Sequence, residues 1–496
     1  MRVLCLGNNT ELTDTQAREL ASQAGVLCYG LLSELDQPLN TEQYSRPGYY
    51  HSSVYDIPYG NLIVLAQNFD RLIILNQTNE QYSHPDAFYK TVQLARELES
   101  TMPVEFQIQT QGQDIAFFEN LVKTNPSFCI FPFIELLANN AHTTVCCRSN
   151  KPITKLTELT DYHTDSNYQA IRQHMLDGIK LPEHCSSCYK VEELGMLSAR
   201  QQETVEWANR LNLTSLDDVR AITDPVYFEV RPSNICNLQC RMCNPGYSQL
   251  IGKEFVKIGL IDQLPNLEHT DFSIVDLNTV KKLYVAGGEP TAMPEFYDFV
   301  DQCIISGRTF EFVVNTNATK INSRFRAQLK QLPHVQFIIS IDGYEQVNDY
   351  IRWPSQWATV INNVRYLQAQ GHTISFNVTV SMYNILTLDQ LLKFFDREFP
   401  NVLVHAQLAE SKKDMLSALN FPNSQLVLER LLPIQQFNCY KNDRLLGSFI
   451  DGLIVHYQTA TFDTNKLQAF FDYNDRLDQS RSCYLRDYIP ELEEYR

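Results

Sequence analysis

Three cysteines lie close together in the middle of the chain, in the segment Cys236-Asn-Leu-Gln-Cys240-Arg-Met-Cys243. The segment follows an apolar run, so we expect a loop whose backbone can wrap around a metal group. An iron–sulfur cube has four irons, and three thiolates leave one of them without a protein ligand. A structural zinc site closes its fourth position with Cys or His, and the Asn-Pro-Gly-Tyr that follows Cys243 offers neither. The pattern predicts an iron–sulfur cluster with one open iron.

Polar and glycine-rich segments follow the next apolar runs along the chain. These segments are Gly287-Gly288-Glu289-Pro290, Asn315-Thr316-Asn317 and Ser340-Ile-Asp342-Gly343, and Arg352 comes shortly after the last of them. Glycines let a backbone approach a ligand closely, and the carboxyl ends of barrel strands are where active sites collect. We therefore expect these segments to line one site with the cysteine loop.

The cysteine triplet and the Gly-Gly-Glu-Pro segment together resemble the radical SAM superfamily, and best its SPASM/twitch-type branch. The resemblance implies a [4Fe–4S] cluster on Cys236, Cys240 and Cys243, with S-adenosylmethionine (SAM) bound to the open iron. It implies reductive cleavage of SAM to a 5′-deoxyadenosyl radical that abstracts hydrogen from a substrate. The residues that would bind SAM are Gly287, Gly288, Glu289, Asn315, Asn317, Ser340, Asp342 and Arg352. Met242 stands where many members carry an aromatic residue against the adenine, so that contact would be a thioether one.

Five further cysteines precede this region, namely Cys129, Cys146, Cys147, Cys185 and Cys188. They resemble a twitch or SPASM half-site, which in many relatives follows the barrel and here comes before it. This resemblance implies a second, auxiliary iron–sulfur cluster held by Cys129, Cys147, Cys185 and Cys188, with Cys146 as the competing choice for the second ligand. A four-cysteine zinc site is the alternative, because Cys-x-x-Cys plus two distant cysteines can also close a tetrahedron around zinc.

Six short β-rich runs alternate with helical stretches between about residues 223 and 404, and this pattern predicts a parallel partial barrel of the (β/α)6 type, an α/β fold. The runs are Val226–Val230, Lys282–Val285, Glu311–Asn315, Val335–Ser340, Thr373–Val380 and Val402–Val404. We expect the radical SAM partial barrel to span residues 221–420, after a cysteine-rich auxiliary module at 119–220 that is irregular and then helical. A helical tail should follow at 421–496.

The first 118 residues have the pattern of a small α/β domain. Apolar runs at Arg2–Leu6, Val26–Leu32 and Arg71–Leu75 predict strands, and Thr13–Ala24 has helical periodicity. The Gly7-Asn8-Asn9 turn lacks the GxGxxG spacing of a dinucleotide site. The role of this domain stays open.

Composition narrows the classes of partner. The 41 basic and 58 acidic residues give a net charge of −17, which disfavours a nucleic-acid substrate because phosphate backbones would be repelled. No run approaches the roughly 18 apolar residues of a membrane span, and the amino terminus does not read as a signal peptide. We expect a cytoplasmic protein that needs a reducing partner such as flavodoxin or ferredoxin.

Three hypotheses for function follow. The first is a radical SAM oxidoreductase of the maturase type that modifies a peptide or protein side chain, by oxidation, cross-linking or epimerisation. The second is the same chemistry on a small metabolite or sugar. The third is a non-catalytic zinc-binding interaction protein. Of the other cysteines, Cys5, Cys28 and Cys303 are expected in the core, and Cys439 and Cys483 either pack or approach the site as hydrogen donors.

Overall fold

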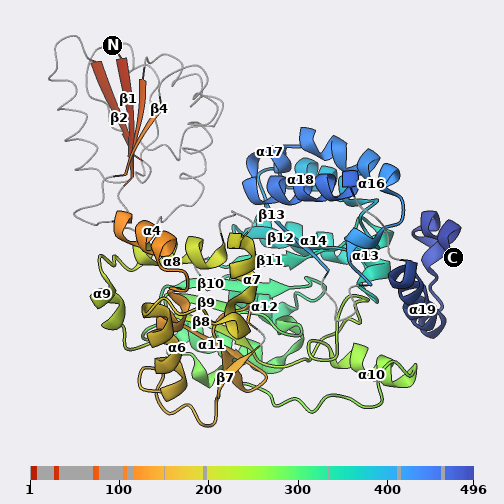
Figure 1. Ribbon diagram of the computed structural model, residues 1–496, viewed down its shortest axis with the longest axis horizontal. Helices are drawn as coiled ribbons and strands as arrows, with labels where there is room; N and C mark the ends of the chain where they lie inside the picture. The colour runs from red at the N-terminus through yellow and green to blue at the C-terminus, as the bar shows by residue number, and fades with distance from the viewer. Residues whose placement is uncertain are drawn as a thin grey trace. The chain divides into compact units, whose positions relative to one another are not determined.

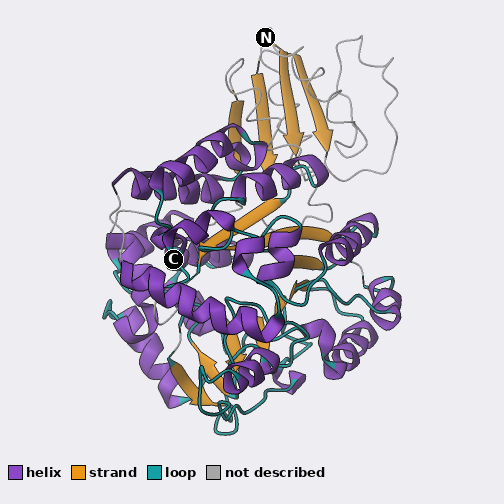
Figure 2. Cartoon of the chain, turned by 90° about the vertical axis from the view of Figure 1, so that its right-hand side faces the viewer, coloured by secondary structure: helices purple, strands orange, loops and turns teal. Residues whose placement is uncertain are grey.

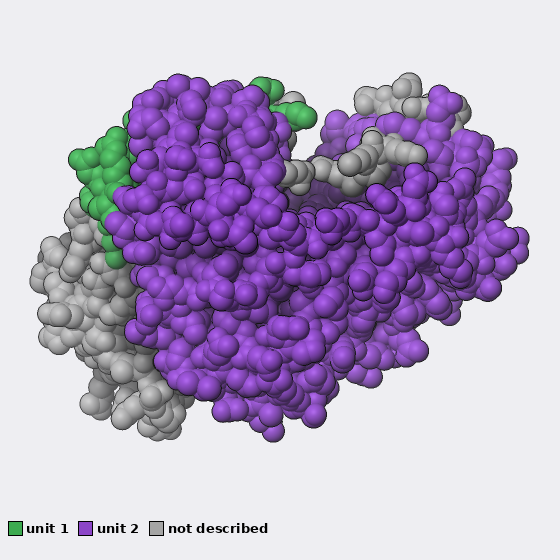
Figure 3. All heavy atoms as spheres, turned by 90° about the horizontal axis from the view of Figure 1, so that it is seen from below, with its two compact units in different colours: residues 1–130, 188–221 green, residues 131–187, 222–496 purple. Residues whose placement is uncertain are grey.

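In this computed structural model, the chain divides into two compact units (Figure 1, Figure 3). The first comprises residues 1–130 and 188–221, and the second comprises residues 131–187 and 222–496. The structure describes residues 2–7, 27–32, 71–76, 104–108, 115–149, 151–193, 198–332, 334–409, 415–459 and 464–496. The domain boundaries that the sequence suggests at 118, 220 and 420 stay a prediction.

The first unit contains a parallel sheet of four strands in the order β2-β1-β3-β4. The strands are β1 (Arg2–Gly7), β2 (Leu27–Leu32), β3 (Arg71–Asn76) and β4 (Val104–Ile108). The three expected strands are present, and β4 is an addition. The helix expected at Thr13–Ala24 and the Asn8-Asn9 turn lie outside the described residues. The α/β pattern of this part is therefore confirmed at the level of its strands.

Helices complete the described part of the first unit. They are α4 (Ile115–Thr124), α8 (Ala199–Arg210) and α9 (Leu216–Arg220), and α4 packs against α8. Ser198 begins α8 with a capping box, in which its side chain accepts from the Gln201 N–H and the Gln201 side chain accepts in return. The buried Arg200 pairs with Glu192 and donates to the Phe128 carbonyl at 2.7 Å. These contacts link the segment around Cys129 to α8.

The second unit is built on a sheet of nine strands in the order β13-β12-β11-β10-β9-β8-β5-β6-β7 (Figure 1). The strands are β5 (Glu135–Asn139), β6 (His142–Thr144), β7 (Pro152–Lys155), β8 (Tyr227–Arg231), β9 (Lys282–Val285), β10 (Glu311–Thr316), β11 (Gln336–Ser340), β12 (Thr373–Val380) and β13 (Leu403–Leu408). Strands β8 to β13 pair in parallel in sequence order, which confirms the expected α/β barrel-type sheet.

Strands β5, β6 and β7 differ from the sequence expectation. They lie in the part that was expected to be irregular and then helical, yet β5 pairs in parallel with β8, and β6 and β7 continue the same sheet in antiparallel fashion. These strands follow one another without intervening helices, so the alternation that reveals the barrel strands is missing here. As a result, Cys146 and Cys147 lie between two strands of the sheet that contains the barrel strands.

Helices lie around this sheet in Figure 2. Those that contribute buried apolar residues to its core are α6 (Ser166–Leu176), α10 (Gln249–Lys257), α11 (Pro294–Ser306), α12 (Ser323–Leu329), α13 (Gln346–Ile351), α14 (Trp357–Ala369) and α15 (Leu388–Glu398). Two further helices are α5 (Phe131–Ile134) and α7 (Pro182–Glu193), and α7 contains the boundary between the two units. Phe376 of β12 stacks on Phe395 of α15 with ring centroids 3.9 Å apart. Aromatic pairs of this kind fix the helices over the strands and so fix the strand ends.

The carboxyl-terminal part is mainly helical, as expected. Its helices are α16 (Ser424–Leu431), α17 (Asn438–Asn442), α18 (Arg444–Thr459) and α19 (Thr464–Arg481). Helix α18 packs against α16 and strand β13. Short 3-10 helices occur at Phe272–Ile274, Pro290–Ala292, Ala418–Asn420, Leu432–Gln436, Leu485–Asp487 and Pro490–Tyr495. Among the described residues, no helix combines the length and the apolar character needed to cross a membrane.

Candidate active site

The cysteine loop follows β8 and holds its shape through contacts within itself. The Cys243 N–H donates to the Cys240 carbonyl at 3.0 Å, and the Leu238 N–H donates to the Cys236 sulfur at 3.4 Å. The buried hydroxyl of Ser248 donates to the Leu238 carbonyl at 2.8 Å. The loop is therefore a compact turn at the carboxyl end of the first barrel strand, as expected from the sequence.

The three thiols of this loop influence one another electrostatically. Burial raises the pKa of Cys236, and the neighbouring Cys240 and Cys243 raise it further. Burial and Cys240 raise the pKa of Cys243 to about 12. Burial also raises the pKa of Cys240, against which the cationic Arg352 acts in the opposite direction. Burial thus favours the neutral thiols, which become thiolates only beside a cationic group such as a metal.

Among the described residues, no three or more His, Cys, Asp or Glu side chains are grouped as ligands of a metal ion. Ligands of a single zinc ion must all converge on one point. In a [4Fe–4S] cube each cysteine binds a different iron, so the sulfurs stay further apart. A cluster on Cys236, Cys240 and Cys243 stays a prediction.

The Gly-Gly-Glu segment after β9 lies directly against the strand-to-loop connection that leads to Cys236. The Gly288 N–H donates to the Ser233 carbonyl at 2.9 Å, and the Glu289 N–H donates to the Ile235 carbonyl at 2.8 Å. A Cβ at Gly288 would lie 2.1 Å from the Ile235 oxygen. Gly288 is needed here because only a residue without a side chain permits this approach.

Both carboxylate oxygens of Glu289 accept hydrogen bonds from other residues of the chain. It is buried, and its carboxylate accepts from the Thr291 N–H and hydroxyl, from the Thr316 hydroxyl, and from the Asn317 N–H at 2.6 Å. These bonds join the end of β9 to the end of β10. Any contact of the Gly287–Glu289 segment with a ligand amino group would therefore use backbone carbonyls, which accept.

The asparagines after β10 connect three neighbouring segments. The Asn315 amide nitrogen donates to the Tyr284 hydroxyl at 3.0 Å, and its oxygen accepts from the Ser340 hydroxyl at 3.1 Å. Asn317 donates to Asn237, inside the cysteine loop, at 3.0 Å. The structure thus brings the ends of β9, β10 and β11 and the cysteine loop together. Sequence reasoning missed Asn237 and Tyr284, although Asn237 lies within the triplet.

Asp342 and Arg352 form a buried ion pair beside the cysteines. Arg352 Nη1 donates to Asp342 Oδ2, and Asp342 Oδ1 accepts from the Thr379 N–H at 2.8 Å. Cys240 and Cys236 both raise the pKa of Arg352, so its guanidinium lies near the two thiols. Its Nε is buried without a hydrogen-bond acceptor. A buried donor without a partner costs stability. An anionic ligand that accepted a hydrogen bond from this Nε would remove that cost.

Residues 230–395 match the family described as the radical SAM superfamily. They include the cysteine loop and the ends of β9, β10 and β11 assembled above. Residues 230–395 form a radical SAM domain. The recognition made from the motifs is therefore confirmed, and domains of this family use a [4Fe–4S] cluster and SAM.

Curated relatives include mycofactocin maturases. The chain is 28% identical to MftC of Mycobacterium ulcerans over 164 residues, which cover 33% of this chain and 42% of the relative. It is 24% identical to MftC of Mycobacterium tuberculosis over 180 residues, or 36% of this chain and 44% of the relative. It thus spans less than half the length of these maturases.

An uncharacterized protein of Methanocaldococcus jannaschii is 24% identical over 286 residues, which cover 52% of this chain and 95% of that protein. Among solved structures, native anSMEcpe with bound AdoMet covers 46% of this chain and 63% of its own, with a TM-score of 0.34 and 15% identity. Streptococcus suis SuiB bound to the precursor peptide SuiA covers 62% and 64%, with a TM-score of 0.31 and 14% identity.

The residues of the radical SAM domain fit its cofactors. The loop offers three thiolates and no fourth ligand in the Asn-Pro-Gly-Tyr segment that follows, which leaves one iron of a cube open. The buried Nε of Arg352 offers an unmatched donor near the thiols. Cys236, Cys240 and Cys243 would hold the cluster, and the assigned strand-end residues would hold SAM.

The second cysteine set is distributed over both units. Cys129 and Cys188 belong to the first unit, and Cys146, Cys147 and Cys185 to the second. Cys185 and Cys188 are one turn apart on α7, so they share a helix face. All five are free thiols. Cys147 is exposed, and the other four are buried. The auxiliary cluster and the choice between Cys146 and Cys147 stay predictions.

The remaining described cysteines have distinct surroundings. Cys303 on α11 is buried among apolar residues, as expected for a core cysteine. Cys439 lies half-buried on α17. Cys483 lies just after α19, and its sulfur is 3.5 Å from the Tyr488 hydroxyl. Met242 packs half-buried against the core. Cys5 and Cys28 lie in strands whose side chains are outside the described part.

Proposed function

We propose that this protein is a radical SAM enzyme of the maturase type that acts on a peptide or protein side chain. The observation that carries the proposal is the junction of the three-cysteine loop with the ends of β9, β10 and β11. When bound there, a reduced cluster and SAM supply a 5′-deoxyadenosyl radical that abstracts hydrogen from the substrate.

The chain's own residues perform the holding and orienting. The backbone of Gly287–Glu289 lies against the segment before Cys236, and Asn317 reaches into the loop through Asn237. Arg352, fixed by Asp342, offers a guanidinium to the carboxylate of SAM. Asp342 positions that arginine, because its carboxylate oxygens already accept from Arg352 and Thr379.

A peptide substrate is supported by the relatives. The matched curated proteins are named maturases, and one of the solved structures is described with a bound precursor peptide. We propose the same substrate class here, together with a reducing partner such as flavodoxin or ferredoxin. We also propose an auxiliary cluster on Cys129, Cys147, Cys185 and Cys188, which would take up the electron that an oxidised substrate gives up.

The test uses short peptides encoded beside the gene. The anaerobically reconstituted protein would be incubated with SAM, dithionite and each peptide, and with a mixture of sugars and small metabolites as the alternative. We expect one peptide to raise 5′-deoxyadenosine formation and to change in mass or in the configuration of a residue. If a sugar or metabolite were turned over instead, the radical SAM activity would stand and the proposed peptide substrate would be wrong.

A metal analysis separates the enzyme from a zinc-binding interaction protein. The proposal requires iron and sulfide in the reconstituted protein. If the protein binds zinc alone and forms no 5′-deoxyadenosine under any of these conditions, the enzymatic proposal is wrong.

A further inference from the structure

Arg241, the first of the two residues between Cys240 and Cys243, is held by contacts from outside the loop. Arg241 is completely buried. Its N–H donates to the Ile351 carbonyl at 2.8 Å, and its carbonyl accepts from the Tyr473 hydroxyl at 2.6 Å. Tyr473 belongs to α19, more than two hundred residues later in the chain. Both backbone groups of Arg241 are thus fixed by other elements of the same unit.

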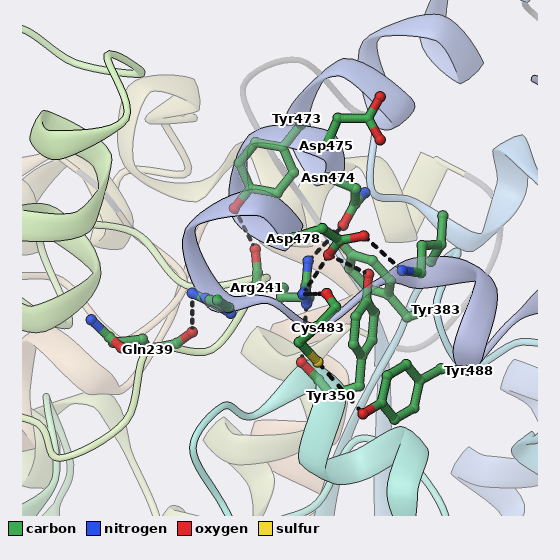
Figure 4. A network of polar contacts seen from close by, with 12 residues as sticks. Gln239, Arg241, Tyr350, Tyr383, Tyr473, Asn474, Asp475, Asp478, Cys483 and Tyr488 are labelled. Carbon is green, nitrogen blue, oxygen red and sulfur yellow. Dashed lines mark hydrogen bonds and ion pairs between the residues drawn. The ribbon is translucent and has the colours of Figure 1, made fainter.

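The guanidinium of Arg241 fills a polar pocket formed largely by α19 and the residues after it (Figure 4). Nη2 pairs with Asp478 at 2.7 Å, and Nη1 donates to the Asn474 side chain at 3.1 Å. Nε donates to the Tyr350 carbonyl at 3.0 Å, and Nη2 also donates to the Cys483 carbonyl at 3.3 Å. A buried arginine needs such complete pairing, because an unpaired buried charge is costly.

Tyr350 and the partners of Asp478 hold this pocket rigid. The Arg241 guanidinium stacks 3.6 Å from the centroid of the Tyr350 ring, and the Tyr350 hydroxyl donates to Asp478 at 3.0 Å. The other Asp478 oxygen accepts from the Leu485 N–H at 2.6 Å. The Tyr383 hydroxyl donates to Asn474 at 2.9 Å. The partners of Arg241 are therefore oriented before any cofactor binds.

A second arginine ties α19 to the other side of Cys240. Arg481 donates to the Gln239 carbonyl at 2.7 Å. Its charge is matched by Glu254 of α10, which accepts from Arg481 Nη2 at 2.6 Å and from Nε at 3.0 Å. The Gln239 N–H donates to the Trp353 carbonyl at 2.6 Å. Residues 239 and 241, on both sides of Cys240, are thus anchored to the end of α19.

We propose that α19 is a positioning element for the cluster: through Asp478, Tyr473 and Arg481 it fixes the backbone on both sides of Cys240, so that the loop retains the cluster and presents its open iron to SAM. This inference rests on the proposed function. If these residues served only to stabilise the fold, packed apolar side chains would suffice in their places. Hydrogen bonds to the carbonyls of the cysteine loop instead fix the positions of its thiolates. Residues that hydrogen-bond to metal ligands from outside the ligand shell act in the same way.

The test compares Asp478→Asn with Asp475→Asn. Both residues lie on α19, but Asp475 is exposed and pairs with Arg496 near the chain end. The reconstituted proteins would be mixed with an iron chelator, and the loss of the SAM-responsive EPR signal of the reduced cluster would be timed. We expect Asp478→Asn to lose this signal about tenfold faster than wild type, the lower end of effects seen for partners beyond the ligand shell. Asp475→Asn should match wild type.

A second pair of variants, with milder substitutions, controls for misfolding. Tyr473→Phe removes only the hydroxyl that donates to Arg241, and Tyr440→Phe removes a hydroxyl that donates to Asp451 on the surface. We expect Tyr473→Phe to shift the midpoint potential of the SAM-binding cluster and to hasten its loss, while the protein still unfolds in one cooperative transition at a slightly lower melting temperature because one buried carbonyl loses its donor. Tyr440→Phe should change neither property.

The outcomes separate the two proposals. If wild type shows a SAM-responsive cluster and Asp478→Asn and Tyr473→Phe retain it as firmly as their controls, the positioning role of α19 is wrong and the enzymatic proposal stands. If wild type shows no SAM-responsive cluster, the enzymatic proposal fails and the inference fails with it.

Discussion

At the scale of single residues, two buried carboxylates organise the site. Glu289 ties the ends of β9 and β10 together through hydroxyl and N–H donors, and Asp342 holds Arg352 beside the thiols. Both carboxylates have their acceptor sites engaged by protein donors. We therefore propose that SAM is bound mainly by backbone carbonyls and by the unpaired Nε of Arg352.

Arg352 should determine the affinity for SAM. We expect Arg352→Lys to weaken SAM binding about tenfold, because an ammonium keeps the charge but loses the fork that matches a carboxylate. Arg365→Lys is the matched control, since Arg365 is exposed and pairs with Glu398. Equilibrium titration of the reconstituted proteins with SAM would measure the effect. Equal affinity in both variants would remove Arg352 from the SAM site.

Glu289 should contribute to stability through its hydrogen bonds. Glu289→Gln places an amide N–H₂ where the carboxylate accepts from donors of Thr291, Thr316 and Asn317. We expect a loss of about 1–3 kcal/mol, because buried donors are left unpaired. Glu295→Gln in the first turn of α11 is the control. Urea denaturation of the cluster-free proteins would show whether the two variants differ, and equal midpoints would contradict this role of Glu289.

At the scale of elements, the site depends on close approaches between strand ends. The turn after β9 contacts the backbone of the segment before Cys236. At Gly288 this contact leaves space for a hydrogen atom but not for a Cβ. The parallel order of β8 to β11 puts these turns side by side. Local backbone geometry and sheet topology together therefore determine the position of the cysteine loop and of its three sulfurs.

Gly288→Ala should damage the cluster site. Its Cβ would meet backbone atoms of Ile235 and Asn234, which can move only by displacing the segment that leads to Cys236. We expect the variant to reconstitute with less iron in the SAM-responsive cluster. Gly452→Ala on α18 has open space for a Cβ and should reconstitute like wild type. Equal iron and sulfide content in the two variants would contradict the close approach.

His372 should make the barrel sensitive to acid. Burial beneath Phe337, and next the nearby His334, lower its pKa to about 4 from 6.5. The unfolded chain therefore binds the proton more readily, and folding free energy is lost as pH falls from 6.5 toward 4. At about pH 5.5 the loss should be about 1 kcal/mol.

His372→Phe should remove this part of the pH dependence. Melting temperatures of the cluster-free wild type and variant, taken at about pH 7.5 and about pH 5.5, would show a smaller drop for the variant. An identical drop in both proteins would mean that His372 does not titrate in this range.

At the scale of the whole molecule, the sequence predicts the sheet of the barrel better than the remainder. Strands β8 to β13 were predictable, because β-rich runs alternate there with helical stretches. Strands β5 to β7 follow one another without a helix between them, so that alternation is missing. Asn237 and Arg241 acquire their roles from partners far away in the chain, which no local pattern encodes.

The second cysteine set leads to a prediction about total metal content. We expect about eight irons per chain after reconstitution, and about four after replacement of Cys185 and Cys188 by alanine, with the SAM-responsive signal retained. Replacement of Cys303 and Cys439 is the matched control and should leave the iron content unchanged. About four irons together with one zinc in wild type would assign the second set to zinc.

The most direct test of the central claim is 5′-deoxyadenosine formation by the anaerobically reconstituted protein with dithionite and SAM, in the presence and absence of the candidate peptides. Wild type and Cys439→Ser should form it, and Cys240→Ser should not, because the loop then lacks one of its three thiolates. Iron-loaded wild type that forms none under either condition, or a Cys240→Ser variant as active as wild type, would contradict the account.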